Sequence, residues 1–191
     1  MEVFMKKTQA GISLVELLLV LSVMTFLLIH FEITGFSQSR EEKLIDSAMA
    51  DIVNAIAMAR LAAVTEAAMV TFCRSDDGQH CRGKWQQGSI IFTDSNGDRT
   101  MNGPDRLLYR LEPIKSRGQL TFRSFRNRQY LQMTPRGTTN YQNGNFTWCP
   151  ANGDPLMIRQ VVVSLTGRTR FAKDSDGDGV VENSQGKEVE C

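Results

Sequence analysis

The stretch that decides the fold is ISLVELLLVLSVMTFLLI, residues 12–29, in which Glu16 is the single charged residue. As a helix, this eighteen-residue stretch is long enough to cross or nearly cross a bilayer. A carboxylate in lipid costs about 2.5–3.5 kcal/mol or more, so the position of Glu16 needs a physical reason. Lys6 and Lys7 precede the stretch, and the positive-inside rule therefore predicts a cytoplasmic N-terminus and an externalised remainder.

A secretory signal peptide is the competing interpretation of the same stretch. It would need a shorter apolar core that is followed by a cleavage site of small residues. The sequence SVMTFLLIHFEI, residues 22–33, offers no such site. We therefore expect a single-pass helix in the bacterial inner membrane, with the body of the protein in the periplasm.

The net charge of +1 hides a segregation of charge along the chain. Residues 99–173 carry thirteen basic side chains against three acidic ones, and eleven of the thirteen are arginine. The tail, residues 174–191, carries six acidic side chains and one basic. A basic block of this kind binds anions even though the whole protein is nearly neutral.

Four cysteines in an externalised chain predict two disulfides. Of the three possible pairings, we favour Cys73–Cys81, which closes a short local loop, together with Cys149–Cys191, which ties the C-terminus to the body. Free buried thiols are the alternative.

Two different sequence patterns follow the apolar stretch. Residues 37–70 have a helical period, with an apolar stripe that includes Ile45, Met49 and Ile56. No proline interrupts residues 12–70, so we expect a nearly continuous helix that spans the membrane over 12–36 and is amphipathic over 37–70. Over residues 71–191, short apolar runs alternate with turn clusters, which is typical of antiparallel β structure. The expected fold class is therefore α+β.

The N-terminus resembles the type IV prepilin signal, through Lys6-Lys7, then Gly11, then ISLVEL from Ile12. In that family, a prepilin peptidase cuts after the glycine and methylates the new N-terminus. The resemblance implies a leader of residues 1–11 that is removed between Gly11 and Ile12. It also implies that Glu16 registers the subunit against the N-terminal amine of a neighbouring subunit, and this amine would compensate the buried charge.

Three further stretches are similar to the GspH/FimT family of minor pilins and pseudopilins: AMARLAAVTEAAMVTFC, GKWQQGSIIFTDSNGD and VVVSLTGRTR. The similarity extends from residue 6 to about residue 171. It implies a type IV pilin-like fold, in which the long N-terminal helix packs on an antiparallel β-sheet body. It also implies a low-copy subunit that assembles with other pilins in a filament. A type IV pilus and a type II secretion pseudopilus both fit these residues.

A second signal is Gly167-Arg168-Thr169-Arg170. Arginine binds phosphate bidentately, and alternate residues of a strand face the same side. In some members of the family, a GRxR element near the C-terminus is associated with DNA binding in natural transformation, and Arg168 and Arg170 match it. We expect this element, with Lys173, to bind double-stranded DNA without sequence preference. The alternative is that the arginines only solvate a hairpin strand.

Asp174, Asp176 and Asp178 begin a pattern similar to a calcium-binding loop, with Glu182 at a later position. The acidic residue expected at the twelfth position is absent, because Gln185 stands there. A solvated acidic turn is the simpler interpretation, with calcium as the alternative. We expect no other cofactor.

The sequence contains no recognisable catalytic constellation, and we expect no enzymatic activity. A zinc site at Cys73, His80 and Cys81 would need a fourth ligand and reduced thiols. The expected function is that of a minor type IV pilin that binds extracellular DNA for uptake. The alternative is a purely structural minor pilin, or a type II secretion pseudopilin, that primes filament assembly.

Overall fold

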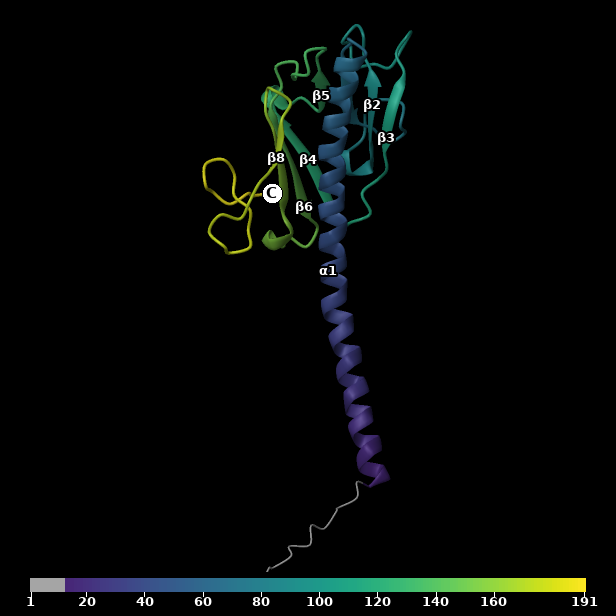
Figure 1. Ribbon diagram of the computed structural model, residues 1–191, viewed down its shortest axis with the longest axis vertical. Coiled ribbons are helices and arrows are strands. Elements are labelled where there is room, and N and C mark those ends of the chain that lie inside the picture. Colours follow the sequence, from purple (N-terminus) through teal and green to yellow (C-terminus); the bar gives the residue numbers. More distant parts are fainter. Residues whose placement is uncertain (1–12) are drawn as a thin grey trace, which may run out of the picture. The chain divides into compact units, whose positions relative to one another are not determined.

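The computed structural model describes residues 13–191, except for the side chains of residues 30–39. The chain divides into two compact units at Arg40/Glu41. Helix α1, Leu14–Thr65, begins in the first unit and ends in the second. The second unit also holds all the strands of the described chain, so the expected α+β class is confirmed (Figure 1).

The first unit presents an apolar helical surface. Every side chain from Ser13 to Ile29 is exposed. The hydroxyl of Ser22 donates to the carbonyl oxygen of Leu19 at 2.8 Å, and that of Thr25 donates to the carbonyl oxygen of Leu21 at 2.9 Å. Both hydroxyls are therefore satisfied within the helix, as an apolar surrounding requires.

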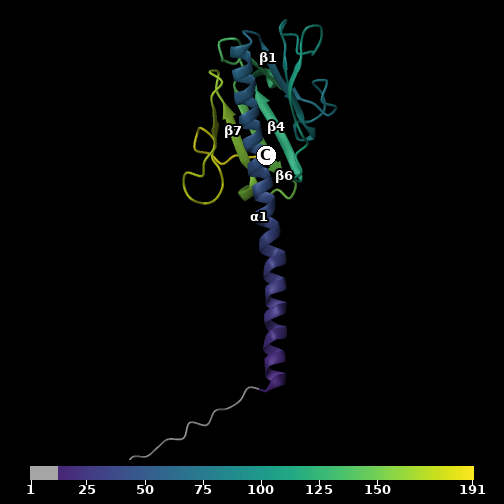
Figure 2. The ribbon, with the colours of Figure 1, turned by 45° about the vertical axis from the view of Figure 1, so that its right-hand side comes forward.

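The second half of α1 is the core helix of the body. Residues Arg40–Thr65 are long and apolar enough to cross a membrane by length and composition alone. Their apolar stripe is nevertheless buried against the sheets, including Ile45, Met49 and Ile56, as the helical period predicted. Figures 1 and 2 show this part of α1 lying across the strands of the body.

The helix ends at Thr65, and the expected end at residue 70 is wrong. Ala67 has a φ of 49°, in the left-handed region that stops a helix. Val70 then begins strand β1, where it pairs with Thr93 on one side and Met133 on the other. Residues 66–70 have a helix-like sequence pattern, but strand pairing at Val70 ends the helix before them.

In residues 13–191, eight strands form two four-stranded antiparallel sheets. The first sheet has the order β3-β2-β1-β5, with β1 Val70–Arg74, β2 Ser89–Thr93, β3 Leu107–Leu111 and β5 Tyr130–Met133. The second has the order β4-β6-β7-β8, with β4 Gly118–Ser124, β6 Gly144–Pro150, β7 Arg159–Val163 and β8 Thr169–Phe171. Short 3-10 turns occur at Trp85–Gln87, Phe125–Asn127 and Pro155–Met157.

The core lies between α1 and the two sheets, and aromatic rings join the sheets where Phe72 of β1 lies 6.0 Å from Phe146 of β6, centroid to centroid. Phe122 stacks on Phe146 with ring centroids 4.2 Å apart, and Trp85 meets Phe146 edge-on at 5.0 Å. Trp148 is fully buried beside them in the same cluster. Such aromatic pairs contribute about 0.5–1.5 kcal/mol each beyond the area they bury.

Two disulfides cross-link the body. Cys73 in β1 is bonded to Cys81, and Cys149 in β6 is bonded to Cys191 at the C-terminus. These are the pairings that the spacing favoured. The second bond holds the tail where Ile158, Ala172, Val181 and Val189 form a small apolar cluster of their own.

Candidate functional site

The GRTR element begins in the turn between β7 and β8, at Gly167 and Arg168, and continues into β8 with Thr169 and Arg170. The amide of Gly167 donates to the carbonyl oxygen of Ser164 at 2.9 Å, and the amide of Ser164 donates to the carbonyl oxygen of Arg168 at 2.9 Å. Gly167 has a φ of 72°, which residues with a Cβ adopt only with strain. The turn therefore fixes the backbone from which both arginines project.

Arg168 and Arg170 are exposed, and neither forms an ion pair with any described side chain. Arg170 stands in register with Val162 of β7. The neighbours of Val162, Val161 and Val163, are buried in the core, so Arg170 lies on the outer face of the sheet. Unpaired arginines on a firm backbone are suited to binding phosphate.

Another arginine shares this outer face. Across the sheet, Arg123 of β4 pairs with Asn145 of β6, which pairs with Val162 of β7. Val162 in turn pairs with Arg170 of β8. Arg123 is also exposed. At about 4.8 Å per strand, the row places the two arginine backbones roughly 14 Å apart. The outer face therefore carries cationic groups at both of its edges.

A second turn of the same design packs behind the first. Between β5 and β6, the amide of Gly137 donates to the carbonyl oxygen of Thr134 at 2.8 Å, and the amide of Thr134 donates to the carbonyl oxygen of Thr138 at 2.8 Å. Gly137 has a φ of 71°. Its neighbour Arg136 is exposed and unpaired among the described side chains. The turn adds a further cation beside the GRTR element.

Arg60 of α1 lies against both glycine turns, although no motif in the sequence marks it as a site residue. A Cβ placed on Gly137 would be 3.2 Å from Nε of Arg60, and one placed on Gly167 would be 3.6 Å from its Cδ. A groove of about 480 Å³ opens here, lined by Ala57, Arg60, Leu61, Val64, Gly167, Arg168 and Thr169. The only feature of the sequence that points to Arg60 is its place directly after Ala59, a buried residue of the apolar stripe of the helix.

Lys173 follows β8, where the chain leaves the sheet for the tail. Its side chain is exposed, and its carbonyl oxygen accepts a hydrogen bond from the amide of Glu182 at 3.0 Å. Lys173 is thus close in sequence to Arg170, but its backbone is bonded to the tail and not to the β7–β8 turn.

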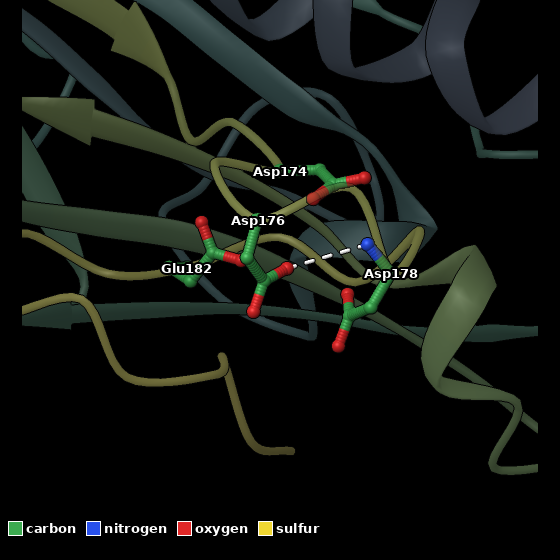
Figure 3. A group of neighbouring side chains, drawn as sticks. All are labelled: Asp174, Asp176, Asp178 and Glu182. Carbon is green, nitrogen blue, oxygen red and sulfur yellow. Dashed lines mark hydrogen bonds between the residues drawn. The ribbon is translucent and has the colours of Figure 1, made fainter.

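The tail brings four carboxylates together. One oxygen from each of Asp174, Asp176, Asp178 and Glu182 lies within 4.8 Å of the others (Figure 3). Glu182 is buried, whereas the three aspartates are exposed. Carboxylate oxygens are the ligands that calcium prefers, so these are the described residues best suited to a divalent cation.

Backbone amides already satisfy this cluster. Asp174 accepts from the amides of Gly177 at 2.6 Å and Gly179 at 2.8 Å, and these bonds hold its pKa below the ordinary 3.8. Glu182 accepts from the amide of Ser175 at 2.7 Å. The arrangement is thus also that of an acidic turn that holds itself together. Among the described side chains, no acid of the tail forms an ion pair with an arginine.

The residues Cys73, Cys81 and His80, which were weighed as zinc ligands, have other partners in the structure. Cys73 and Cys81 are bonded to each other, and Nδ1 of His80 lies 2.7 Å from Oδ2 of Asp77. The bond to His80, with those from the backbone amides of residues 79 and 80, holds the pKa of Asp77 well below its usual range. His80 therefore serves the loop that the disulfide closes.

Glu16 stands in the first turn of α1 and is exposed. A carboxylate there interacts favourably with the positive end of the helix dipole. Within residues 13–191, no hydrogen bond or ion pair of its side chain is present. The expected cleavage site, Gly11 and Ile12, lies outside the described residues.

Comparison with known proteins adds a family and a fold. The family model of the type II transport protein GspH matches residues 48–167. No curated protein sequence matches the chain significantly. The type IV minor pilin FimU of Pseudomonas aeruginosa strain PAO1 is similar in two crystal forms. One has a TM-score of 0.54 at 20% identity over 73% of this chain and 93% of that chain, and the other has 0.50 at 19% over 67% and 92%.

The minor pseudopilin EpsH of the type 2 secretion system of Vibrio cholerae has a TM-score of 0.46 at 12% identity, over 65% of this chain and 92% of that one. The FimU similarities support the fold, an N-terminal helix packed on antiparallel sheets. The family match covers the core helix from residue 48 and every strand except β8.

Proposed function

Because this chain belongs to the GspH family of type II transport proteins, we propose that it is a minor pilin whose arginine hairpin captures double-stranded DNA for uptake. The family accounts for the filament-subunit design. The DNA-binding role goes beyond the family and is argued from the hairpin. This is a structural and binding role, and it requires no catalytic group.

Assembly begins with the N-terminal segment. Prepilin peptidase cleaves between Gly11 and Ile12, and the apolar segment holds the subunit in the inner membrane with its body in the periplasm. The exposed apolar side chains of Leu14–Ile29 then pack against other pilins. Glu16 has no described partner in its own chain, so the free amine of a neighbouring subunit is its proposed counter-charge.

The observation that carries DNA binding is the pair of exposed, unpaired arginines on a rigid glycine turn. Arg168 and Arg170 project from a backbone that is fixed by the φ of 72° at Gly167. The acidic tail, although it follows directly, forms no ion pair with them. Phosphate contacts of this kind are independent of base sequence and are weakened by salt.

A binding titration tests the proposal. Full-length protein in non-ionic detergent micelles is titrated against a fluorescent DNA duplex at two salt concentrations, beside the Arg168→Ala/Arg170→Ala protein. We expect wild-type binding to weaken with salt, and the double variant to reduce the slope of log K against log salt by about 1.8, for two phosphates. Equal binding by the two proteins would rule out the hairpin as the DNA site.

A purely structural subunit is the second candidate. The match to a type II transport protein favours it, since a secretion pseudopilus needs no DNA ligand. In that case, wild-type protein shows no binding to the duplex even at low salt, while its incorporation into a filament is unaffected by changes at the hairpin.

A further inference from the structure

We infer that Arg60 of α1 is a phosphate-binding residue of the same DNA site, so that the duplex lies over the groove between α1 and the β7–β8 turn. This rests on the proposed function and adds the place and a third arginine to it. Helix α1 thus supplies a phosphate-binding side chain as well as part of the core of the body.

The contacts of Arg60 place its side chain at the turn. Its Cδ lies 3.6 Å from where a Cβ on Gly167 would be, and its Nε lies 3.2 Å from the same position on Gly137. A Cβ on Gly137 would crowd the arginine, whereas one on Gly167 would be in ordinary van der Waals contact with it. The guanidinium is therefore held beside the turn by packing, while the side chain as a whole stays exposed.

The groove offers a site for an anion with an apolar flank. Arg60 of α1 and Arg168 of the turn both line the groove, and the aliphatic side chains of Leu61 and Val64 line it with them. Leu61 is 65% exposed and Val64 is 50% exposed, so the groove is open to a large ligand. A sugar–phosphate backbone matches this combination of cations and apolar surface.

The charge of Arg60 is free for a ligand. Among the described side chains, Arg60 takes part in no ion pair. The acid closest to Arg60 in the sequence, Glu66, follows the end of α1 and is already paired with Arg106. Arg136, next to Gly137, adds a further unpaired cation. Of the side chains that the structure describes, no carboxylate lines the groove.

The test compares Arg60→Gln with Lys43→Gln in the duplex titration, using full-length protein in micelles. Lys43 is an exposed cation of the same helix that has no ion-pair partner among the described side chains. It lies about 25 Å from Arg60 along the axis, at 1.5 Å per residue. We expect Arg60→Gln to lower the salt slope by about 0.9, and Lys43→Gln to leave it unchanged. Arg60→Lys should retain the slope.

The outcomes separate the two claims. If the hairpin double variant loses binding but Arg60→Gln behaves as Lys43→Gln, the inference about Arg60 is overturned and the proposed function stands. If the hairpin double variant binds as the wild type does, the proposed function fails, and the inference fails with it.

A second variant covers the case in which Arg60→Gln disturbs the turns. Leu61→Glu places a carboxylate in the groove at a side chain with little packing role, and Leu107→Glu makes the same change at an exposed leucine of β3. We expect only Leu61→Glu to weaken DNA binding, at least several-fold at low salt. Equal binding by these two variants would also overturn the inference.

Discussion

A Cβ atom on Gly167 would lie 3.1 Å from the carbonyl oxygen of Gly137, so the β5–β6 and β7–β8 turns are packed back to back. The two turns have the same pair of backbone hydrogen bonds and the same left-handed glycine. Arg60 covers them from the helix. The arginine hairpin is therefore braced by a second sheet and by α1.

Gly167→Ala should lower the free energy of unfolding by about 1–2 kcal/mol, because the new Cβ combines a strained φ with contact to the carbonyl of Gly137. Gly153→Ala is the control, since Gly153 also has a φ of 71° but nothing lies within 4 Å of its Cβ position. Thermal unfolding followed through the buried Trp85 and Trp148 measures both. An equal cost at the two sites would show that the packing of the turns contributes nothing.

Loss of the Cys149–Cys191 bond should destabilise the body more than loss of the Cys73–Cys81 bond. The bonds link residues 42 and 8 apart, and loop-closure entropy gives about 4 and 2.6 kcal/mol respectively. Paired Cys→Ser variants compared by chemical denaturation test the order. The reverse order would indicate that the tail retains its place through the Ile158–Val189 cluster without the covalent bond.

Acid should loosen the tail from Asp174 outward. Hydrogen bonds from the amide of Gly177, then from that of Gly179, depress the pKa of Asp174 in the folded state below 3.8. The stability that these bonds contribute is present above the pKa of Asp174 in the unfolded chain. It is lost as the pH falls toward the lower pKa of Asp174 in the folded chain, so the loop weakens only below about pH 4. Amide NMR shifts of Gly177 and Gly179 should titrate there. Gly186, whose amide donates to a backbone carbonyl, should not follow them.

Glu16→Gln should leave cleavage of the leader intact but prevent incorporation into filaments, because the amide has the size of the carboxylate without its charge. Ser22→Ala is the control, since the Ser22 hydroxyl bonds only within its own helix. Immunoblots of sheared filaments and of membranes measure the two pools. Normal amounts of Glu16→Gln in filaments would contradict the proposed pairing with a neighbour's amine.

The helical period of apolar residues and the spacing of the cysteines were sufficient to predict the local features of the fold. A 3.6-residue period identified the buried stripe through Ile45, Met49 and Ile56, and the eight-residue separation favoured the Cys73–Cys81 bond. The end of the helix was missed because residues 66–70 satisfy a helical pattern, while the two strands that pair with Val70 are far away in the sequence.

The site could be predicted only in part, because side-chain contacts between distant segments leave no local pattern. Arg60 meets Gly167 across more than a hundred residues. Likewise, Oε1 of Glu41 accepts a hydrogen bond from the hydroxyl of Ser116 at 2.5 Å, and nothing in either neighbourhood predicts it. Composition indicated a basic block, but only the sheet register sets Arg123 in line with Arg170.

The most direct test of the central claim measures piliation and transformation frequency together in cells that carry Arg168→Ala/Arg170→Ala. Cells with Arg99→Ala/Arg126→Ala, two arginines outside the hairpin that contact aromatic rings, are the matched control. We predict normal filaments in both strains and a fall in DNA uptake only in the hairpin strain. Normal uptake in the hairpin strain, or a loss of its filaments that accounts for the loss of uptake, would contradict the claim.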